Sequence, residues 1–230
     1  MEHLVSSIIG SGCAEVLTLP ICTVKTIYQT NTLSGKTISQ IISYIYLTNG
    51  FKGFFQASVP AITSQILSTS SKYYLYHQIK SYRQTDPNDL LSNSFNGALG
   101  GVGGSLLSHP FDVWKNYMQR DQRLQKLNLS TLYSGYSGSF VKNIVLYSIL
   151  FPVYDFYKLH IGNTVLAAIG TTLTCSIVTQ PVDYYKTVLM SGSKFTSWSN
   201  PYKGFGLMVS RSIPHFIISM SITDYIKKLL

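Results

Sequence analysis

Charged residues are scarce in this chain, and acidic ones are the scarcest. Only 12% of the 230 residues are charged, and 18 Lys and Arg residues face 9 Asp and Glu residues, which gives a formal net charge of +9. This charged share is about half that of an average soluble domain. Because 45% of the residues are hydrophobic, the composition excludes a disordered tail and a coiled coil.

Cysteine is almost missing as well. Cys13, Cys22 and Cys175 are too few and too far apart for a disulfide framework or a paired-cysteine zinc site. The five histidines show no metal-ligand spacing, and no nucleophile elbow is present. The first three residues lack the basic segment that a secretory signal needs. We therefore expect no secretory signal, no metal, no cofactor and no enzymatic activity.

Charge is absent altogether from three long stretches, residues 53–71, 90–111 and 159–182. Each stretch, as a helix rising about 1.5 Å per residue, is long enough to cross most or all of a hydrocarbon layer of roughly 30 Å. Polar residues are interspersed, so each helix should turn one face to lipid and another to protein or water. The alternative is a soluble all-α protein in which the same helices are buried.

Two short patterns each occur three times along the chain. The first is a proline with an acid or cysteine two residues later and a lysine three residues beyond, at residues 20–25, 110–115 and 181–186. The second combines aromatic residues, an acid or histidine and a lysine, at residues 76–80, 154–158 and 223–227. An aromatic and glycine cluster lies between them in every unit, at residues 49–57, 133–135 and 202–204. This order indicates three repeats, about 1–86, 87–160 and 161–230.

These patterns resemble the repeat of the mitochondrial carrier family over nearly the whole chain. The resemblance implies an all-α membrane protein, a single domain of six transmembrane helices in three pseudo-threefold repeats around a central cavity. The expected helices cover residues 4–30, 56–82, 92–122, 137–160, 163–190 and 205–229. The loops after the second and third proline patterns are short, so we expect their surface helices to be truncated. The family also implies a multi-pass monomer in the mitochondrial inner membrane.

The resemblance implies that the proline pattern forms a gate on the matrix side of the cavity. A proline inside a helix removes one backbone hydrogen bond and kinks it, which can bring three helix ends together. By resemblance, Asp112 pairs with Lys186 and Asp183 pairs with Lys25. Cys22 stands where the first acid belongs, so the remaining lysine should have no partner and the gate should hold two ion pairs. The residues of this predicted gate are Pro20, Lys25, Pro110, Asp112, Lys115, Pro181, Asp183 and Lys186.

The second pattern predicts a gate at the opposite mouth. Asp155 can pair with Lys227, and Asp224 can pair with Lys80. His77 replaces the acid that would face Lys158, so this gate too should hold two ion pairs. Such pairs largely offset their Coulomb energy by desolvation, which makes them better latches than stabilisers.

Between the gates, the resemblance assigns substrate contacts thirteen residues before the second pattern's acid position, at Ser64, Lys142 and Arg211. An unpaired cation at bilayer depth is costly unless it faces water or a ligand, so the substrate should be an anion. Arginine suits bidentate capture of phosphate or carboxylate. The neighbouring residue Asn143 is a further contact, and Tyr147, with Tyr73 or Tyr74, could stack on a base.

Nucleotide exchange, of nucleoside or deoxynucleoside phosphates, is the function we expect. Carriers for a keto acid, an amino acid or inorganic phosphate remain alternatives, because the family's nucleotide carriers usually have glycine and an aliphatic residue at 142 and 143. A basic nucleic-acid-binding protein is the rival of a different class. Its bases should form one stripe, whereas those of this chain recur at helix ends, so no nucleic-acid partner is expected.

Two further expectations concern lipid and helix packing. The element Tyr202-Lys203-Gly204 resembles the family's cardiolipin sites, where a helix amino terminus offers free N–H groups to phosphate. Five glycines fit close contacts between membrane helices, namely Gly10, Gly12, Gly97, Gly101 and Gly104.

Overall fold

The computed structural model describes residues 2–30, 32–33, 35–83, 90–120, 128–191 and 200–229, and within them the regular secondary structure is helical. Its six long helices begin and end within a few residues of the predicted bounds. They are α1 (Glu2–Gln29), α3 (Ser58–Arg83), α4 (Leu90–Gln119), α6 (Tyr136–Ile161), α7 (Thr164–Met190) and α8 (Phe205–Leu229). The three signature prolines lie inside helices, Pro20 in α1, Pro110 in α4 and Pro181 in α7.

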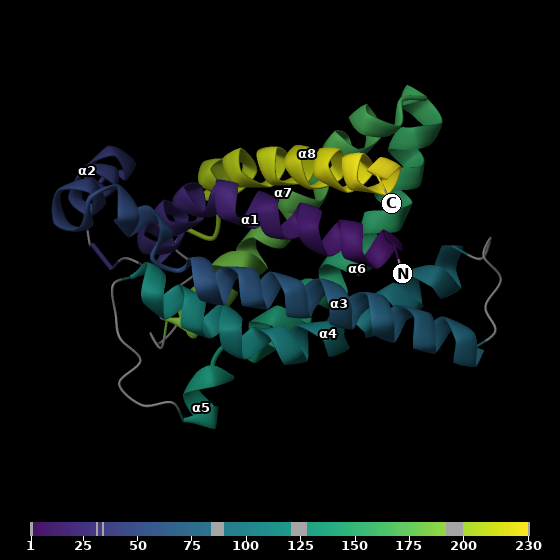
Figure 1. Ribbon diagram of the computed structural model, residues 1–230, viewed down its shortest axis with the longest axis horizontal. Helices are drawn as coiled ribbons and strands as arrows, with labels where there is room; N and C mark the ends of the chain where they lie inside the picture. Colours follow the sequence, from purple (N-terminus) through teal and green to yellow (C-terminus); the bar gives the residue numbers. More distant parts are fainter. Residues whose placement is uncertain are drawn as a thin grey trace.

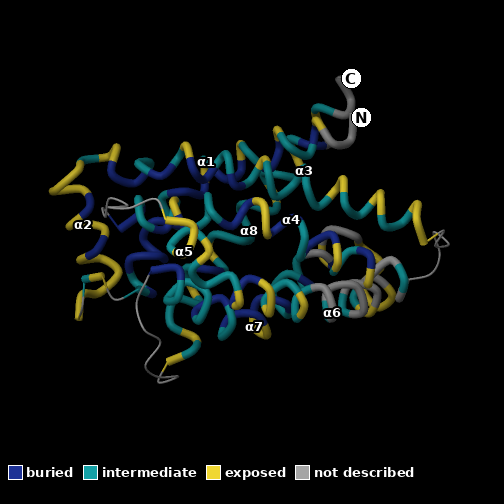
Figure 2. The backbone as a smooth tube through the Cα atoms, turned by 90° about the horizontal axis from the view of Figure 1, so that it is seen from below, coloured by how far each residue is buried: buried dark blue, intermediate teal, exposed yellow. Residues whose placement is uncertain are grey.

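The six long helices pack as a closed ring in the order α1, α3, α4, α6, α7, α8. The most extensive contacts join α3 with α4, α6 with α7, and α8 with α1, and Figure 1 shows α1 lying between α8 and α3. In addition, α1, α4 and α7 contact one another. The helices therefore surround a shared interior, and α1 begins at the same end of the molecule at which α8 ends (Figures 1 and 2).

One shorter helix, α2 (Ile38–Asn49), covers the opposite end of the ring (Figure 1). Thr37 begins it with a capping box, because its hydroxyl accepts from the Gln40 backbone and its own N–H donates to the Gln40 side chain. Ile41 and Ile45 are buried against α1 and against Phe54 of the 3₁₀ helix η1 (Phe51–Phe55). This apolar cluster anchors α2 on the ring.

The corresponding segment of the second loop is a single turn, α5 (Leu129–Leu132). The predicted truncation is therefore confirmed in that loop. In the third loop, residues 192–199 lie outside the described part of the chain.

Glycines set the closest approach between helices at two of the predicted positions. A Cβ on Gly104 would lie 2.9 Å from the backbone nitrogen of Lys72 on α3, and a Cβ on Gly10 would lie 2.7 Å from the backbone oxygen of Ser219 on α8. The prediction for Gly12 is wrong, because no atom of another helix among the described residues lies within 4 Å of a Cβ placed there. Packing of α3 on α4, and of α1 on α8, thus depends on the absence of a side chain.

Two segments of the described helices, Val5–Gln29 in α1 and Phe205–Thr223 in α8, are long and apolar enough to cross a bilayer by length and composition. Half of the apolar window in α1 is buried inside the ring, a much larger share than in α8. Polar side chains such as Glu15, Thr18 and Gln29 are among those buried in α1. One face of this helix is therefore built to meet a polar interior.

Candidate functional site

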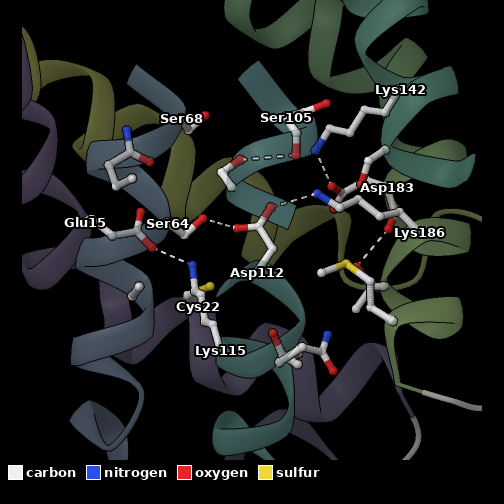
Figure 3. Close-up of a pocket in the computed structure, with 18 of the residues that line it drawn as sticks. Glu15, Cys22, Ser64, Ser68, Ser105, Asp112, Lys115, Lys142, Asp183 and Lys186 are labelled. Atoms are coloured by element: carbon white, nitrogen blue, oxygen red, sulfur yellow. Dashed lines mark hydrogen bonds and ion pairs between the residues drawn. The ribbon is translucent and has the colours of Figure 1, made fainter. Parts of the chain in front are cut away.

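A polar cavity of about 320 Å³ lies inside the ring and is lined by residues from all six long helices. Part of its lining is drawn in Figure 3. The charged lining residues are six cations and three carboxylates: Lys25, Lys72, Lys115, Lys142, Lys186, Arg211, Glu15, Asp112 and Asp183. The formal charge of this lining is therefore 6 − 3 = +3. Hydroxyl and amide side chains occupy most of the remaining positions, so the cavity is suited to an anion that also accepts hydrogen bonds.

Asp183 of α7 is buried and binds two lysines. Lys25 of α1 donates to one of its oxygens, and Lys142 of α6 donates to the other. The contact with Lys25 was predicted. The contact with Lys142 was not, because that lysine was expected to be free for substrate. The attraction between this buried carboxylate and its two ammonium partners offsets part of the cost of removing these charges from water.

Asp112 of α4 is the second carboxylate. Lys186 Nζ of α7 lies 3.4 Å from its Oδ2, which is the second predicted ion pair. Ser64 of α3 donates its hydroxyl proton to the other oxygen. The two predicted pairs of this gate are thus present as contacts, while their role as a gate stays a prediction.

Glu15 of α1 is the third carboxylate and corrects a prediction. Lys115 Nζ of α4, which was expected to have no partner, lies 2.5 Å from Glu15 Oε1. On α8, Arg211 Nη2 lies 2.6 Å from Glu15 Oε2, and His215 Nε2 lies 3.5 Å from the same oxygen. The expectation of two ion pairs was wrong because the acid comes from a position two helical turns before Cys22. Three pairs therefore link α1, α4 and α7 in a cycle.

The three carboxylates share one arrangement. Each binds one lysine of the predicted gate and one of the three predicted substrate contacts. The structure thus brings Ser64, Lys142 and Arg211 to a single cavity, but none of them is free. The idea that Lys142 and Arg211 are unpaired is wrong, since each has an internal carboxylate partner that a sequence pattern of one helix cannot show.

The remaining predicted substrate contacts have different outcomes. Asn143 lines the cavity, and its amide donates to the Gly101 carbonyl at 3.4 Å. The side chain of Tyr147 lies outside the described residues. Tyr74 is exposed, and the ring of Tyr73 contacts that of His77 in a tilted arrangement with a centroid distance of 4.3 Å. Neither Tyr73 nor Tyr74 is among the cavity-lining residues of the described chain, so the prediction that they stack on a base receives no support.

The predicted opposite gate falls largely on side chains outside the described ones, namely those of Asp155, Lys158, Asp224 and Lys227. Their backbones belong to α6 and α8. The remaining member, Lys80, lies on α3 with its Nζ 5.8 Å from the centre of the Tyr76 ring. The ion pairs of this gate therefore stay predictions.

The element Tyr202-Lys203-Gly204 forms the turn before α8, with Gly204 at φ 79°. The Lys203 carbonyl accepts hydrogen bonds from Gln29 Nε2 at 3.0 Å and from Gln180 Nε2 at 3.1 Å. Its ammonium lies 4.7 Å from the centre of the Tyr28 ring, and burial lowers the pKa of Lys203. The side chains of Lys203 and Tyr28 line a second cavity beside the start of α2.

Three of the cavity residues that sequence reasoning missed stand out by charge or hydrogen bonding, namely Glu15, Gln119 and Lys72. Glu15 could have been noticed in the sequence, because an acidic residue in a largely apolar helix rarely lacks a partner of opposite charge. Gln119 accepts a hydrogen bond from the Thr26 hydroxyl at 2.7 Å, and a glutamine stands nine residues after both Pro20 and Pro110. Lys72 lies on α3 beyond Ser64, and no pattern in the sequence marks it.

The chain is similar to known carriers. The family model described as "Mitochondrial carrier protein" matches residues 1–87. A mitochondrial carrier-like protein, L276, of Acanthamoeba polyphaga mimivirus is 35% identical over 98% of this chain and 95% of its own length. Kidney mitochondrial carrier protein 1 of Xenopus laevis is 27% identical over 70% of this chain and 64% of its own. The mitochondrial dicarboxylate transporter of Saccharomyces cerevisiae is 23% identical over 78% of this chain and 72% of its own.

Proposed function

The chain belongs to the mitochondrial carrier family, and from this membership we propose that it exchanges anionic metabolites, above all nucleoside or deoxynucleoside phosphates, across the mitochondrial inner membrane. The observation that carries the proposal is the cavity with a formal charge of +3, lined from all six long helices. Buried cations in excess of carboxylates favour an anionic ligand.

We further propose that the six long helices span the membrane as three repeats. The closed ring of helices and the threefold recurrence of a carboxylate joining a lysine to a substrate contact support this arrangement. Because one chain forms the whole cavity, it works as a monomer. Members of the family are transporters, so no cofactor and no catalytic step are required.

Alternating access follows from where the ion pairs lie. Three ion pairs form a cycle that joins α1, α4 and α7, with Lys25, Lys115 and Lys186 as the cations. This cycle keeps the cavity closed at the end where the predicted matrix-side gate lies. Opening requires all three pairs to part, which a bound anion achieves by competing for the cations. The pairs at the opposite mouth then form instead, so that one end is latched at a time.

The turn at Tyr202-Lys203-Gly204 is proposed to bind a cardiolipin phosphate. Lys203 provides the positive charge, and the positive end of the helix dipole at the start of α8 favours a phosphate there. The hydrogen bonds from Gln29 and Gln180 to the Lys203 carbonyl hold this turn against α1 and α7. Lipid binding at this point would therefore steady two gate helices.

A carboxylate substrate is the second candidate. A relative named for dicarboxylate transport covers most of the chain, and Arg211 can bind a carboxylate as well as a phosphate. The nucleotide is favoured because the cavity offers many hydroxyl and amide groups beyond its charges. A nucleic-acid-binding function is disfavoured, since six of the 18 basic residues face an internal cavity.

The test is counter-exchange in reconstituted vesicles with radiolabelled ATP, dATP, 2-oxoglutarate and inorganic phosphate. Exchange of the nucleotides is expected in the wild type and its loss in Arg211→Ala, with Arg211→Lys as the matched control that keeps the charge. Exchange of 2-oxoglutarate alone would favour the second candidate. Undiminished nucleotide exchange by Arg211→Ala would overturn the assignment of this cavity.

A further inference from the structure

We propose that Glu15 couples anion binding at Arg211 to release of Lys115, a role that rests on the proposed transport function. Lys115 is one of the three lysines of the ion-pair cycle, Lys25, Lys115 and Lys186, which we call latch lysines. Glu15 bridges these two cations with its separate oxygens, at 2.6 Å from Arg211 Nη2 and 2.5 Å from Lys115 Nζ. A ligand that takes Arg211 therefore acts directly on the partner of Lys115.

The position of Glu15 makes this link different from the other two. Asp112 and Asp183 stand at the acid position of the proline pattern, whereas Cys22 occupies that position in α1. Glu15 precedes Cys22 by two helical turns, which is about 10 Å along the axis and on the same face. The carboxylate of the first repeat therefore lies deeper along α1, beside the predicted substrate contact of α8.

The burial of Glu15 strengthens its electrostatic interactions with Arg211 and Lys115. The Glu15 side chain is 3% exposed, so its charge depends on the cations that surround it. The groups that contact its carboxylate are Lys115 of α4 and Arg211 and His215 of α8. In such an environment, a second anion beside Glu15 is repelled far more strongly than in water.

Arg211 has donor capacity left for a ligand. Its Nε is buried and finds no acceptor in the described part of the chain. A phosphate or carboxylate that engages the guanidinium must share it with Glu15, and like-charge repulsion then favours departure of Glu15 from Arg211. Movement of Glu15 loosens its hydrogen bond to Lys115, because both contacts belong to one short side chain.

The structure also supplies a matched comparison. Asp112 binds a latch lysine too, but its second partner is the neutral hydroxyl of Ser64. Glu15→Gln and Asp112→Asn each remove one negative charge from the cavity and one carboxylate from a latch. Of the two variants, only Glu15→Gln frees a charged residue among the three predicted substrate contacts, namely Arg211, because the substrate contact of Asp112 is the neutral Ser64. The difference between these variants therefore isolates competition at Arg211 from a general gain in positive charge.

The experiment uses the full chain, with ATP as the probe and inorganic phosphate as a second probe. Uptake is measured into vesicles preloaded with the same anion and into empty vesicles, and the dissociation constant is measured on detergent-solubilised protein. Relative to Asp112→Asn, Glu15→Gln should lower the KM and dissociation constant for ATP about tenfold, since Arg211 loses a charged hydrogen-bond partner. Its ratio of empty to preloaded uptake should rise, because release of Lys115 no longer waits for the anion.

Several results would overturn the proposal. An unchanged KM and uptake ratio with a lowered melting temperature would mean that Glu15 only stabilises the helices. Equal changes in Asp112→Asn would mean that net charge alone acts. If Glu15→Gln does not fold, Glu15→Asp keeps the charge but is too short to bridge both cations, so either the KM should fall, where Arg211 is released, or the uptake ratio should rise, where Lys115 is released.

Failure of the transport function would be recognised separately. A wild type that binds ATP but moves neither probe anion refutes transport, whereas tighter binding by Glu15→Gln would still show competition at Arg211. A wild type that exchanges ATP, with a Glu15→Gln variant of the same KM, refutes the coupling and leaves transport intact. A wild type that neither binds nor exchanges either anion refutes both.

Discussion

At the scale of single residues, the charges that surround the cavity carry the function. The resemblance of the proline pattern to the carrier repeat predicted that Asp183 meets Lys25 and that Asp112 meets Lys186, and both contacts are present. Glu15 was not predictable in this way, since its partners Arg211 and Lys115 are remote in sequence and lie on two other helices. A sequence repeat identifies residues that occupy equivalent positions. It cannot identify Glu15, which supplies the missing carboxylate of the first repeat from a different position.

Lys72 supplies the first prediction at this scale. It lines the cavity, and within the described part of the chain it makes no ion pair. A cation without a carboxylate partner is available to an incoming anion before any internal pair has to break. Lys72→Gln should therefore raise the KM for ATP in vesicle exchange about tenfold.

Lys52 gives the matched control, because it is exposed on η1 and does not line the cavity. Lys52→Gln makes the same change in net charge and should leave the KM as in the wild type. Equal effects of the two variants would mean that Lys72 contributes only to the overall field.

The two aspartates supply the second prediction. The Asp183 side chain is 7% exposed and holds two lysines, whereas that of Asp112 is 29% exposed and holds one. Asp183→Asn leaves the buried ammonium of Lys25 and the partly buried ammonium of Lys142 without a counter-charge, and should cost about 3 kcal/mol of stability, and Asp112→Asn clearly less. Unfolding can be followed with a thiol-reactive dye, since Cys22 and Cys175 are buried. A larger loss in Asp112→Asn would contradict this ranking.

At the scale of helices, three uncharged stretches and the resemblance to the carrier repeat were enough to predict the six long elements. They were not enough to predict which glycines touch a neighbour, because a glycine's surroundings depend on how each helix is rotated in the ring. Gly104 faces the backbone of α3, while Gly12 on α1 faces open space. The loops were predictable in length, and α5 is short because its loop has too few residues for another helix such as α2.

These two glycines supply the third prediction. Gly104→Val places a side chain against the backbone and stem of Lys72, so α3 and α4 must separate, at a cost of about 2 kcal/mol. The same shift should displace the ammonium group of Lys72 in the cavity and raise the KM for ATP. Gly12→Ala adds a methyl group where nothing is near and should raise stability by about 1 kcal/mol through helix propensity. The dye assay compares both, and a neutral Gly104→Val would mean that the helices are not in close contact.

At the scale of the whole molecule, a closed ring around a charged interior is the feature that separates a carrier from a basic soluble protein. The sequence indicated this ring only through resemblance to a family, since no single helix reveals its neighbours. Exposed apolar side chains such as Leu17, Val59, Leu107 and Leu166 lie on the ring helices. The charges of the cavity lie inside, so the outer surface is suited to lipid.

The fourth prediction follows from this inside-out distribution of charge. After expression in a eukaryotic cell, the protein should remain in the mitochondrial membrane pellet through alkaline carbonate extraction. Peripheral proteins held by electrostatic attraction should be released under the same conditions. Release of this chain together with them would contradict the proposal that the long helices span the membrane.

The contact between α1 and α8 also has a consequence for how the protein is made. The ribosome synthesises α1 early and α8 late, yet Glu15 finds Arg211 and Gly10 meets Ser219 only when both helices are present. Until α8 is made, Glu15 of α1 lacks its counter-ion Arg211. We therefore expect chains that stop before α8 to be less stable than the full chain and to be degraded more quickly.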